Sequence, residues 1–328
     1  MRKVNLAVVG ATGMVGSTIL QVLEDRDFPY ENLYLFSSAK SAGEKLTVKG
    51  VEYTLEELTE TCFDGKDIDI AMFAAGGAVS KKFAPIANEK GIVVVDNSAN
   101  FRMDKNIPLV IPEVNADTLT KDSMLISNPN CSTIQSIMVL KPLYDAFGLK
   151  RVIYNTYQAV SGSGVKGVRD LEEGTCDNYP YPISKNTLPH IDDFTENGYT
   201  KEEMKMIDET HKILGDDSIK VTATTVRVPV KNSHAVSMNI EFEKPFELDE
   251  VFKVLENAPG VVVEDNVAEL IYPLQQNADG NDNVFVGRIR RDFSLDNGIN
   301  LWCVSDNIRK GAATNTVQIA EVVVDRLQ

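Results

Sequence analysis

The 328-residue chain is poor in several features that would each point to a particular class of protein. It has only four cysteines and three histidines, with no C-x-x-C spacing, which argues against a disulfide framework or a metal site. It has no apolar run long enough to span a bilayer and no signal-peptide pattern, so we expect no membrane partner and a cytoplasmic location. Asp and Glu (48) outnumber Lys and Arg (33), and the net charge of −15 argues against a nucleic-acid partner.

What the chain does contain is a first part in which short apolar runs alternate with amphipathic segments. Strands are expected at residues 4–9, 33–36, 69–74, 92–95 and 124–126, with helices at 14–24 and 79–89. This order is typical of an α/β domain, a Rossmann-like parallel sheet covered by helices on both faces.

From about residue 151 the strands become longer and richer in β-branched residues, which predicts an α+β domain with a mixed sheet and helices on one side. The expected strands are 152–160, 219–228, 234–243, 284–289 and 299–304. A last helix at 312–327 is expected to pack back on the first domain. The predicted division is a dinucleotide-binding domain (1–130), a catalytic and dimerisation domain (131–308) and the C-terminal helix (309–328).

A glycine-rich turn follows the first strand and opens the first helix, with the sequence G-A-T-G-M-V-G over residues 10–16. Glycines there let the backbone approach a pyrophosphate at the helix N-terminus, although such a turn can also be purely structural. After the second strand, the loop 36–43 offers hydroxyls and Lys40 but no carboxylate before Glu44. Because an NAD site would place a carboxylate there, this loop favours NADP, with an ordinary solvated loop as the alternative.

Cys131 lies in the segment Ser127-Asn128-Pro129-Asn130-Cys131-Ser132-Thr133, between an apolar strand and an apolar helical run. Since Asn, Ser and Thr cap helix N-termini, we expect this cysteine at the start of a helix, where backbone N–H groups stabilise a thiolate. A thiolate nucleophile beside a nicotinamide suggests aldehyde oxidation through a thioester. A small structural cysteine at a tight turn is the alternative.

Such chemistry needs a group that moves protons near neutral pH, and histidine suits this best. His211 lies on a charged amphipathic helix expected at residues 201–214, and His190 lies in a loop, whereas His234 opens a strand. Arg227 ends the preceding strand, and we expect a hairpin to bring Arg227 and His234 together. Arg227 could then bind a carboxylate in bidentate fashion, with a surface ion pair as the alternative.

Several longer motifs resemble the aspartate-β-semialdehyde dehydrogenase family over essentially the whole chain. They are GATGMVG, NSANFRMD (97–104), SNPNCSTIQ, YQAVSGSG (157–164), EEMKM (202–206), RVPVKNSHAV (227–236), FVGRIRRD (285–292) and the C-terminal DNIRKGAATNTVQIAE.

The resemblance implies a role for each of a set of residues. Cys131 would be the acyl-thioester nucleophile, His234 the acid/base and Gln158 a substrate-orienting group. The substrate would be bound through Arg227 (carboxylate), Glu202 (ammonium), and Arg102 and Lys205 (phosphate). NADP would contact Gly10, Thr12, Gly13, Met14, Val15, Lys40, Ser41, Ser161, Gly162 and Asn307. Many relatives carry Arg at the position of Lys40, and Lys keeps the charge but lacks the bidentate fork.

The implied reaction is the reversible conversion of L-aspartate-4-semialdehyde, phosphate and NADP⁺ to 4-aspartyl phosphate and NADPH, on the route to lysine, threonine and methionine. The family is typically dimeric and sometimes tetrameric. Two other hypotheses remain at this point: another thioester-forming reductase, of the N-acetyl-glutamyl-phosphate or glyceraldehyde-3-phosphate type, and a catalytically silent NADP-binding sensor.

Overall fold

The computed structural model describes residues 3–326, which divide into two compact units. Within the described residues, the first comprises 3–129 and 312–326, and the second is Asn130–Gly311. The second junction falls a few residues beyond the expected position 308, because a π-helical turn, Arg309–Ala313, precedes the last helix. We propose these units as the domains of the protein.

The described part of the first unit contains a six-stranded sheet in the order β5-β2-β1-β6-β7-β8, with every pair parallel. The parallel, Rossmann-like first sheet is therefore confirmed. The strands are β1 (Val4–Val9), β2 (Tyr30–Ser37), β5 (Glu56–Glu57), β6 (Ile70–Phe73), β7 (Val93–Asp96) and β8 (Leu125–Ser127).

Helices cover both faces of this sheet because successive side chains of its strands point to opposite sides. In β1, Leu6 and Val8 join the core beneath α1 (Met14–Asp25) and α9 (Thr314–Arg326). Ala7 and Val9 join the core beneath α2 (Gly77–Glu89). The C-terminal helix α9 thus packs beside α1, where Arg26 pairs with Glu321 at 2.7 Å.

The sequence analysis did not anticipate the smaller elements of this unit. A hairpin of β3 (Lys45–Val48) and β4 (Val51–Thr54) follows β2, and α3 (Pro112–Asn115) precedes β8. Residue 327, where the last helix was expected to end, lies outside the described residues.

The second unit contains, within the described residues, a mixed six-stranded sheet in the order β10-β9-β11-β14-β13-β12. The pairs β9–β10 and β12–β13 are parallel and the others antiparallel, as predicted for a mixed sheet. The strands are β9 (Leu149–Gln158), β10 (Lys220–Arg227), β11 (His234–Phe242), β12 (Val261–Val263), β13 (Val284–Arg291) and β14 (Gly298–Ser305).

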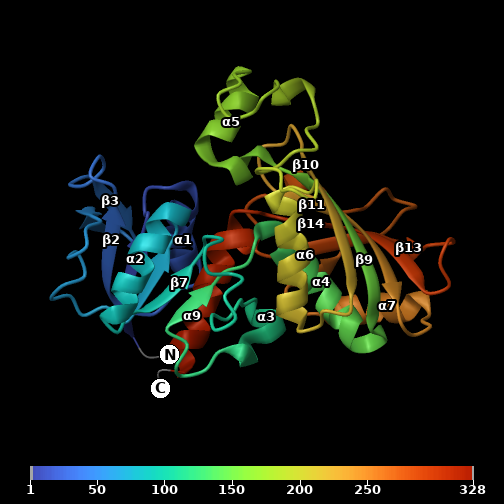
Figure 1. The fold of residues 1–328 in the computed structure, drawn as a ribbon, viewed down its shortest axis with the longest axis horizontal. Coiled ribbons are helices and arrows are strands. Elements are labelled where there is room, and N and C mark those ends of the chain that lie inside the picture. The colour runs from blue at the N-terminus through green and yellow to red at the C-terminus, as the bar shows by residue number, and fades with distance from the viewer. Residues whose placement is uncertain (1–2, 327–328) are drawn as a thin grey trace. The chain divides into compact units, whose positions relative to one another are not determined.

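One face of this mixed sheet carries the helices α4 (Cys131–Phe147), α6 (Lys201–Leu214) and α7 (Leu248–Glu256) (Figure 1). Tyr154 of β9 is buried on this side, where its hydroxyl bonds Thr210 of α6 at 2.9 Å. Tyr157, three residues further along β9, points to the opposite face and is 38% exposed. The opposite face is covered in part by the four-residue helix α8 (Gln275–Ala278), whose Ala278 packs with Ala235 and Val304 of the sheet.

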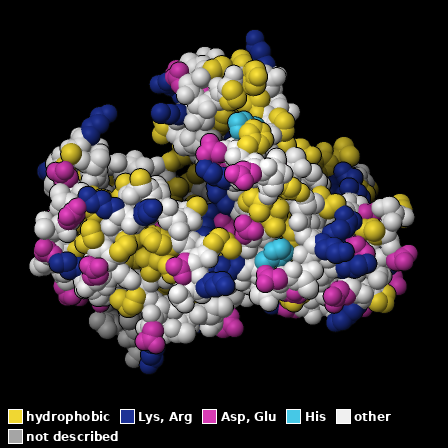
Figure 2. Space-filling view, in the orientation of Figure 1, with side chains coloured by type: hydrophobic (Ala, Val, Ile, Leu, Met, Phe, Trp, Pro, Cys, Tyr) yellow, Lys and Arg dark blue, Asp and Glu magenta, His cyan; other side chains and the backbone are white. Residues whose placement is uncertain are grey.

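The segment between β9 and α6 has a small hydrophobic core of its own, formed by Val160, Tyr179, Ile183 and Leu188. It contains η2 (Val160–Ser163), α5 (Gly164–Glu173) and η3 (Ile183–Lys185). Apolar side chains gather on its surface (Figure 2), including Val165, Tyr181 and Phe194. Within residues 3–326, no helix is both long and apolar enough to cross a bilayer.

Candidate active site

Cys131 is the first residue of α4, as the capping pattern predicted. Asn130 is the N-cap, and its Oδ1 accepts hydrogen bonds from the backbone N–H groups of Ser132 (2.9 Å) and Thr133 (3.3 Å). Gly311 lies against the cysteine so closely that a Cβ built there would be 2.9 Å from the Cβ of Cys131. The position of Gly311 therefore leaves no room for a side chain.

The turn before Cys131 is held by two carboxylates of α6. The backbone N–H of Asn130 donates to Glu209 at 2.7 Å, and its Nδ2 donates to Glu202 at 2.9 Å. Both glutamates are buried. Every polar group of the Asn130 side chain is thus engaged, which orients the first turn of α4.

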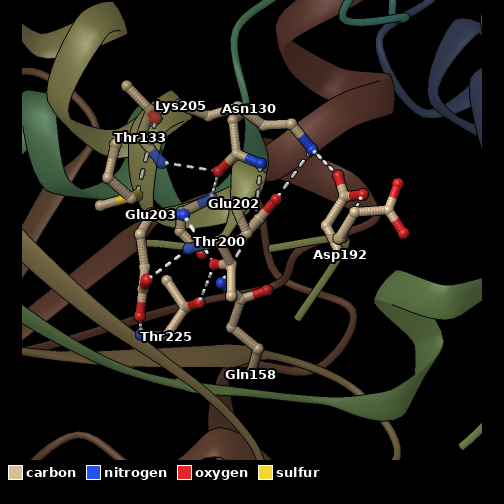
Figure 3. A network of polar contacts seen from close by, with 12 residues as sticks. Asn130, Thr133, Gln158, Asp192, Thr200, Glu202, Glu203, Lys205 and Thr225 are labelled. Carbon is tan, nitrogen blue, oxygen red and sulfur yellow. Dashed lines mark hydrogen bonds and ion pairs between the residues drawn. The ribbon is translucent and has the colours of Figure 1, made fainter. Parts of the chain in front are cut away.

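Glu202 is the centre of the network shown in Figure 3. Its Oε1 also accepts from Gln158 Nε2 at 3.1 Å, and its Oε2 pairs with Lys205 at 3.1 Å. Burial by itself would raise the pKa of Glu202, but the charge of Lys205 and the three donors outweigh it and lower that pKa to about 2. Glu202 is therefore ionised throughout the physiological range.

Arg227 and His234 do come together, but the predicted hairpin is wrong. The strand β9 lies between β10 and β11, pairing in parallel with one and antiparallel with the other. The end of β9 joins the two side chains: Arg227 Nη1 donates to the Ala159 carbonyl at 2.6 Å, and the Ala159 N–H donates to His234 Nδ1 at 3.0 Å. A Cβ built on Gly162 would lie 2.9 Å from Arg227 Nη1 and 3.2 Å from His234 Nε2.

Arg227 and His234 both place polar atoms against Gly162. Burial, and then the charge of Arg227, lowers the pKa of His234 from its ordinary value to about 3, so the ring is neutral. Since Nδ1 accepts from Ala159, the ring proton lies on Nε2. Among the residues that the structure describes, neither His234 Nε2 nor Arg227 Nε has a hydrogen-bond partner. Such buried donors are expected to meet a ligand acceptor.

Ser161 and Asn307, which the family resemblance assigns to NADP, lie beside this pair in the second unit. Asn307 Nδ2 donates to Ser161 Oγ at 3.0 Å, and its Oδ1 accepts from the Ser233 N–H at 2.9 Å. Ser233, next to His234, has a positive φ of 68°. A serine in this conformation is uncommon, and here it sets the entry into β11.

The remaining nucleotide residues lie in the first unit, at the turn between β1 and α1. Thr12 and Gly13 are exposed, and Met14 and Val15 begin the helix α1. Gly10 has a φ of 87°, and a Cβ there would lie 2.9 Å from the backbone of Ala74. The turn thus has the close-packed glycine and open helix N-terminus that fit a pyrophosphate.

Lys40 is exposed and Ser41 half-exposed in the loop after β2. The short strand β5 was not anticipated, and it places Glu56 and Glu57 beside Phe36 and Ser37. Glu56 is paired with Lys66 at 3.0 Å.

Arg102, assigned to phosphate by the resemblance, also lies in the first unit and is 8% exposed. Its Nε donates to the Asn128 carbonyl and its Nη2 to the Asn97 carbonyl, both at 2.9 Å. These backbone contacts fix the guanidinium plane.

Sequence reasoning missed four residues of the second-unit site: Glu209, Asp192, Ser233 and Gly311. Two of them lie inside quoted motifs and so gave a local signal: Ser233 in RVPVKNSHAV and Gly311 in the C-terminal motif. Glu209 and Asp192 come close to Asn130 and Lys205 through tertiary packing, which spacing along the chain does not reveal.

Two family models cover most of the chain. Residues 5–122 match the NAD binding domain of semialdehyde dehydrogenases, and residues 140–310 match the semialdehyde dehydrogenase dimerisation domain. The fold and the site thus define a semialdehyde dehydrogenase with a nucleotide-binding domain and a second, cysteine-bearing domain.

Individual relatives identify the family within this class of semialdehyde dehydrogenases. The chain is 52% identical to an aspartate-semialdehyde dehydrogenase of Aquifex aeolicus, over 97% of each chain. A crystal structure of aspartate semialdehyde dehydrogenase II from Vibrio cholerae, complexed with ASA, superposes with a TM-score of 0.93 at 45% identity over 99% of each chain. A crystal structure of aspartate semialdehyde dehydrogenase with NADP from Candida albicans superposes with a TM-score of 0.80, at 25% identity over 99% of each chain. The chain belongs to the aspartate-semialdehyde dehydrogenase family and is an oxidoreductase acting on an aldehyde group.

Proposed function

We propose that the chain interconverts L-aspartate-4-semialdehyde and 4-aspartyl phosphate, using phosphate and NADP, through an acyl thioester on Cys131. The observation that carries the proposal is the buried Arg227–His234 pair around Gly162, with one donor of each side chain lacking a partner among the described residues. It lies in the same unit as a cysteine at a capped helix N-terminus. The names of the relatives supply the substrate.

In this proposal the Cys131 thiolate attacks the aldehyde carbon, and a C–S bond forms. The N-terminus of α4 favours the thiolate, since Asn130 caps the N–H groups of Ser132 and Thr133 while leaving the dipole directed at Cys131. NADP⁺, when bound, supplies the acceptor for the hydride that converts the thiohemiacetal to a thioester. Phosphate then attacks the acyl carbon, the C–S bond breaks and the thiolate is regenerated.

His234 would act first as a donor. With Nδ1 occupied by the Ala159 N–H, the neutral ring offers Nε2–H to the oxygen that becomes negative when the thiolate adds. The ring keeps this proton, and the oxyanion that it stabilises re-forms the C=O bond as the hydride leaves. His234 therefore acts in the addition step as a hydrogen-bond donor, and it could accept a proton only after Nδ1 had left the Ala159 N–H.

The charged groups of the substrate match the charges of the site. Arg227 would bind the α-carboxylate through Nε, and the ionised Glu202 would hold the α-ammonium. Lys205 and Arg102 would bind phosphate, and Gln158, hydrogen-bonded to Glu202, would orient the acyl group. For the cofactor, we assign the pyrophosphate to Gly10–Val15 and the 2′-phosphate to Lys40 and Ser41, with Ser161, Gly162 and Asn307 completing the set.

The test is an absorbance assay of NADPH formation with aspartate semialdehyde, compared with glutamate semialdehyde, each with and without phosphate. We expect phosphate-dependent turnover of the aspartyl substrate and its loss in Cys131→Ser. Cys176→Ser removes an exposed thiol outside the site and serves as the matched control. Near-normal activity of Cys131→Ser, or a preference for the glutamyl substrate, would overturn the proposal.

We also propose a homodimer formed through the face of the second sheet opposite α4, α6 and α7, with a tetramer as the larger alternative. A family model names this region a dimerisation domain. The face bears Tyr157 beside Trp302, with 5.3 Å between the ring centres and the rings tilted by 48°, and a cavity of about 380 Å³ beside Tyr272 and Leu274. Because the proposed nucleophile must stay reduced, we place the enzyme in the cytoplasm.

A further inference from the structure

Lys205 lies between two carboxylates, and only one of them has a part in the proposed mechanism. Its Nζ is 3.1 Å from Glu202 Oε2 and 2.8 Å from Asp192 Oδ2 (Figure 3). Glu202 is enclosed and bound by Asn130 and Gln158 as well. Asp192 comes from the loop before α6, and its side chain is 35% exposed.

All three groups are charged. Burial would raise the pKa of Asp192, but the hydrogen bond and charge of Lys205 lower it overall. Burial would likewise lower the pKa of Lys205, but Glu202 and Asp192 raise it overall. The trio therefore carries one net negative charge. Two of the three ammonium donors of Lys205 are already directed at carboxylates, which disfavours a phosphate at this lysine.

The backbone on either side of Asp192 is anchored, so the direction of this carboxylate is set by the fold. Before it, Leu188 exchanges two backbone hydrogen bonds with Arg227, at 2.9 and 2.8 Å. After it, the Asp193 carbonyl accepts from the Lys201 N–H at 2.8 Å. Asp192 itself has a φ of 67°, in the left-handed region that Asp tolerates better than most side chains.

We infer that Asp192 is a specificity-determining residue that competes with the phosphate group of the substrate for Lys205. Phosphate would bind Lys205 by displacing the Asp192 carboxylate, which therefore sets the concentration of phosphate that the reaction needs. Neutral molecules, and singly charged anions that cannot displace it, are excluded. The inference rests on the proposed function, since it takes Lys205 as a phosphate ligand.

The experiment compares the KM for phosphate in the full-length protein and in Asp192→Asn and Asp192→Gly. Asn keeps the shape of the side chain, and both replacements tolerate the positive φ. Asp193→Asn is the matched control: its carboxylate pairs with Lys201 at 2.6 Å instead of Lys205. Lys205→Met tests whether the lysine binds phosphate at all.

We expect the KM for phosphate to fall about fivefold in both Asp192 variants, with the KM for aldehyde and cofactor unchanged, as for a partly exposed ion pair. Asp193→Asn should match the unaltered protein, and Lys205→Met should raise the KM for phosphate. An unchanged or raised phosphate KM in both Asp192 variants, together with a raised KM in Lys205→Met, overturns the competition alone. Absence of phosphate-dependent turnover in the unaltered protein overturns the proposed function and the competition together.

Discussion

At the scale of the single residue, His234 couples the site to the stability of the fold. The ring is completely buried, and its pKa falls to about 3, whereas the same histidine in the unfolded chain titrates near its ordinary value of 6.5. As the pH falls, this histidine therefore binds a proton in the unfolded chain before it does so in the folded chain. The contribution of His234 to the free energy of unfolding is fully present above pH 6.5 and is lost progressively as the pH falls toward 3.

His234→Gln should remove this pH dependence, because Gln does not titrate. Between about pH 7 and about pH 5, the free energy of unfolding of the unaltered protein should fall by about 2 kcal/mol more than that of His234→Gln. Urea unfolding at both pH values measures the difference. Glu202, with its pKa lowered to about 2, contributes only below its ordinary 4.5 and so lies outside this window.

His190→Gln provides the comparison, because His190 is exposed and stacks only on the Phe194 ring. The free energy of unfolding of His190→Gln should depend on pH as that of the unaltered protein does. Equal pH dependence in His234→Gln and the unaltered protein would show that the buried ring does not have the lowered pKa.

At the scale of the element, the N-terminus of α4 determines the environment of Cys131, the proposed nucleophile. Asn130 caps this helix, and α6 holds Asn130 from the other side through Glu202 and Glu209. The helix α6 has an N-cap of its own, Thr200, in a capping box with Glu203. The two caps are chemically alike, but only one adjoins the cysteine.

Asn130→Ala should therefore cost about 1 kcal/mol of stability and also slow alkylation of Cys131 several-fold, because the first turn loses its cap and its orientation. Thr200→Ala should cost a similar amount and leave the alkylation rate unchanged. Both variants are made in a Cys176→Ser background, and mass spectrometry of the Cys131 peptide follows the reaction with iodoacetamide. Equal alkylation rates in the two variants would contradict a role for the cap in activating the thiol.

At the scale of the whole molecule, the mixed sheet of the second unit presents one face on which, within the described residues, the short helix α8 covers only a part. Exposed apolar side chains line its border, including Leu274 at 48% and Ile271 at 44% exposure. An apolar surface of this kind on a sheet is typical of a subunit interface.

We expect light scattering to give twice the mass of one chain, and Leu274→Lys to shift the distribution toward the monomer by placing a charge in the interface. Val51→Lys, at an exposed site on the hairpin of the first unit, is the control and should leave the mass unchanged. A monomeric unaltered protein would overturn the proposed dimer.

Local patterns predicted the elements well where a local cause produces them. The helix α6 begins and ends at the residues expected, because Thr200 caps it and Gly215 follows its last turn with a φ of 67°. The hairpin between β10 and β11 was wrong because connection along the chain does not show that β9, some sixty residues earlier, inserts between them. The strands β3 and β4 alternate apolar and polar residues over only four residues each, and β5 has two residues, so their patterns were too short to be recognised.

The sequence by itself determined the cysteine at a helix start, the glycine turn after the first strand, both fold classes and the family, since each depends on residues that are near neighbours or on a motif. Only the tertiary structure decided which groups meet: β9 brings Arg227 and His234 to Ala159, and α6 brings Glu209 to Asn130. It also decided their ionisation, because burial and neighbouring charges set the pKa of His234 and Glu202. Proximity and burial arise from packing between distant segments, and no spacing along the chain encodes them.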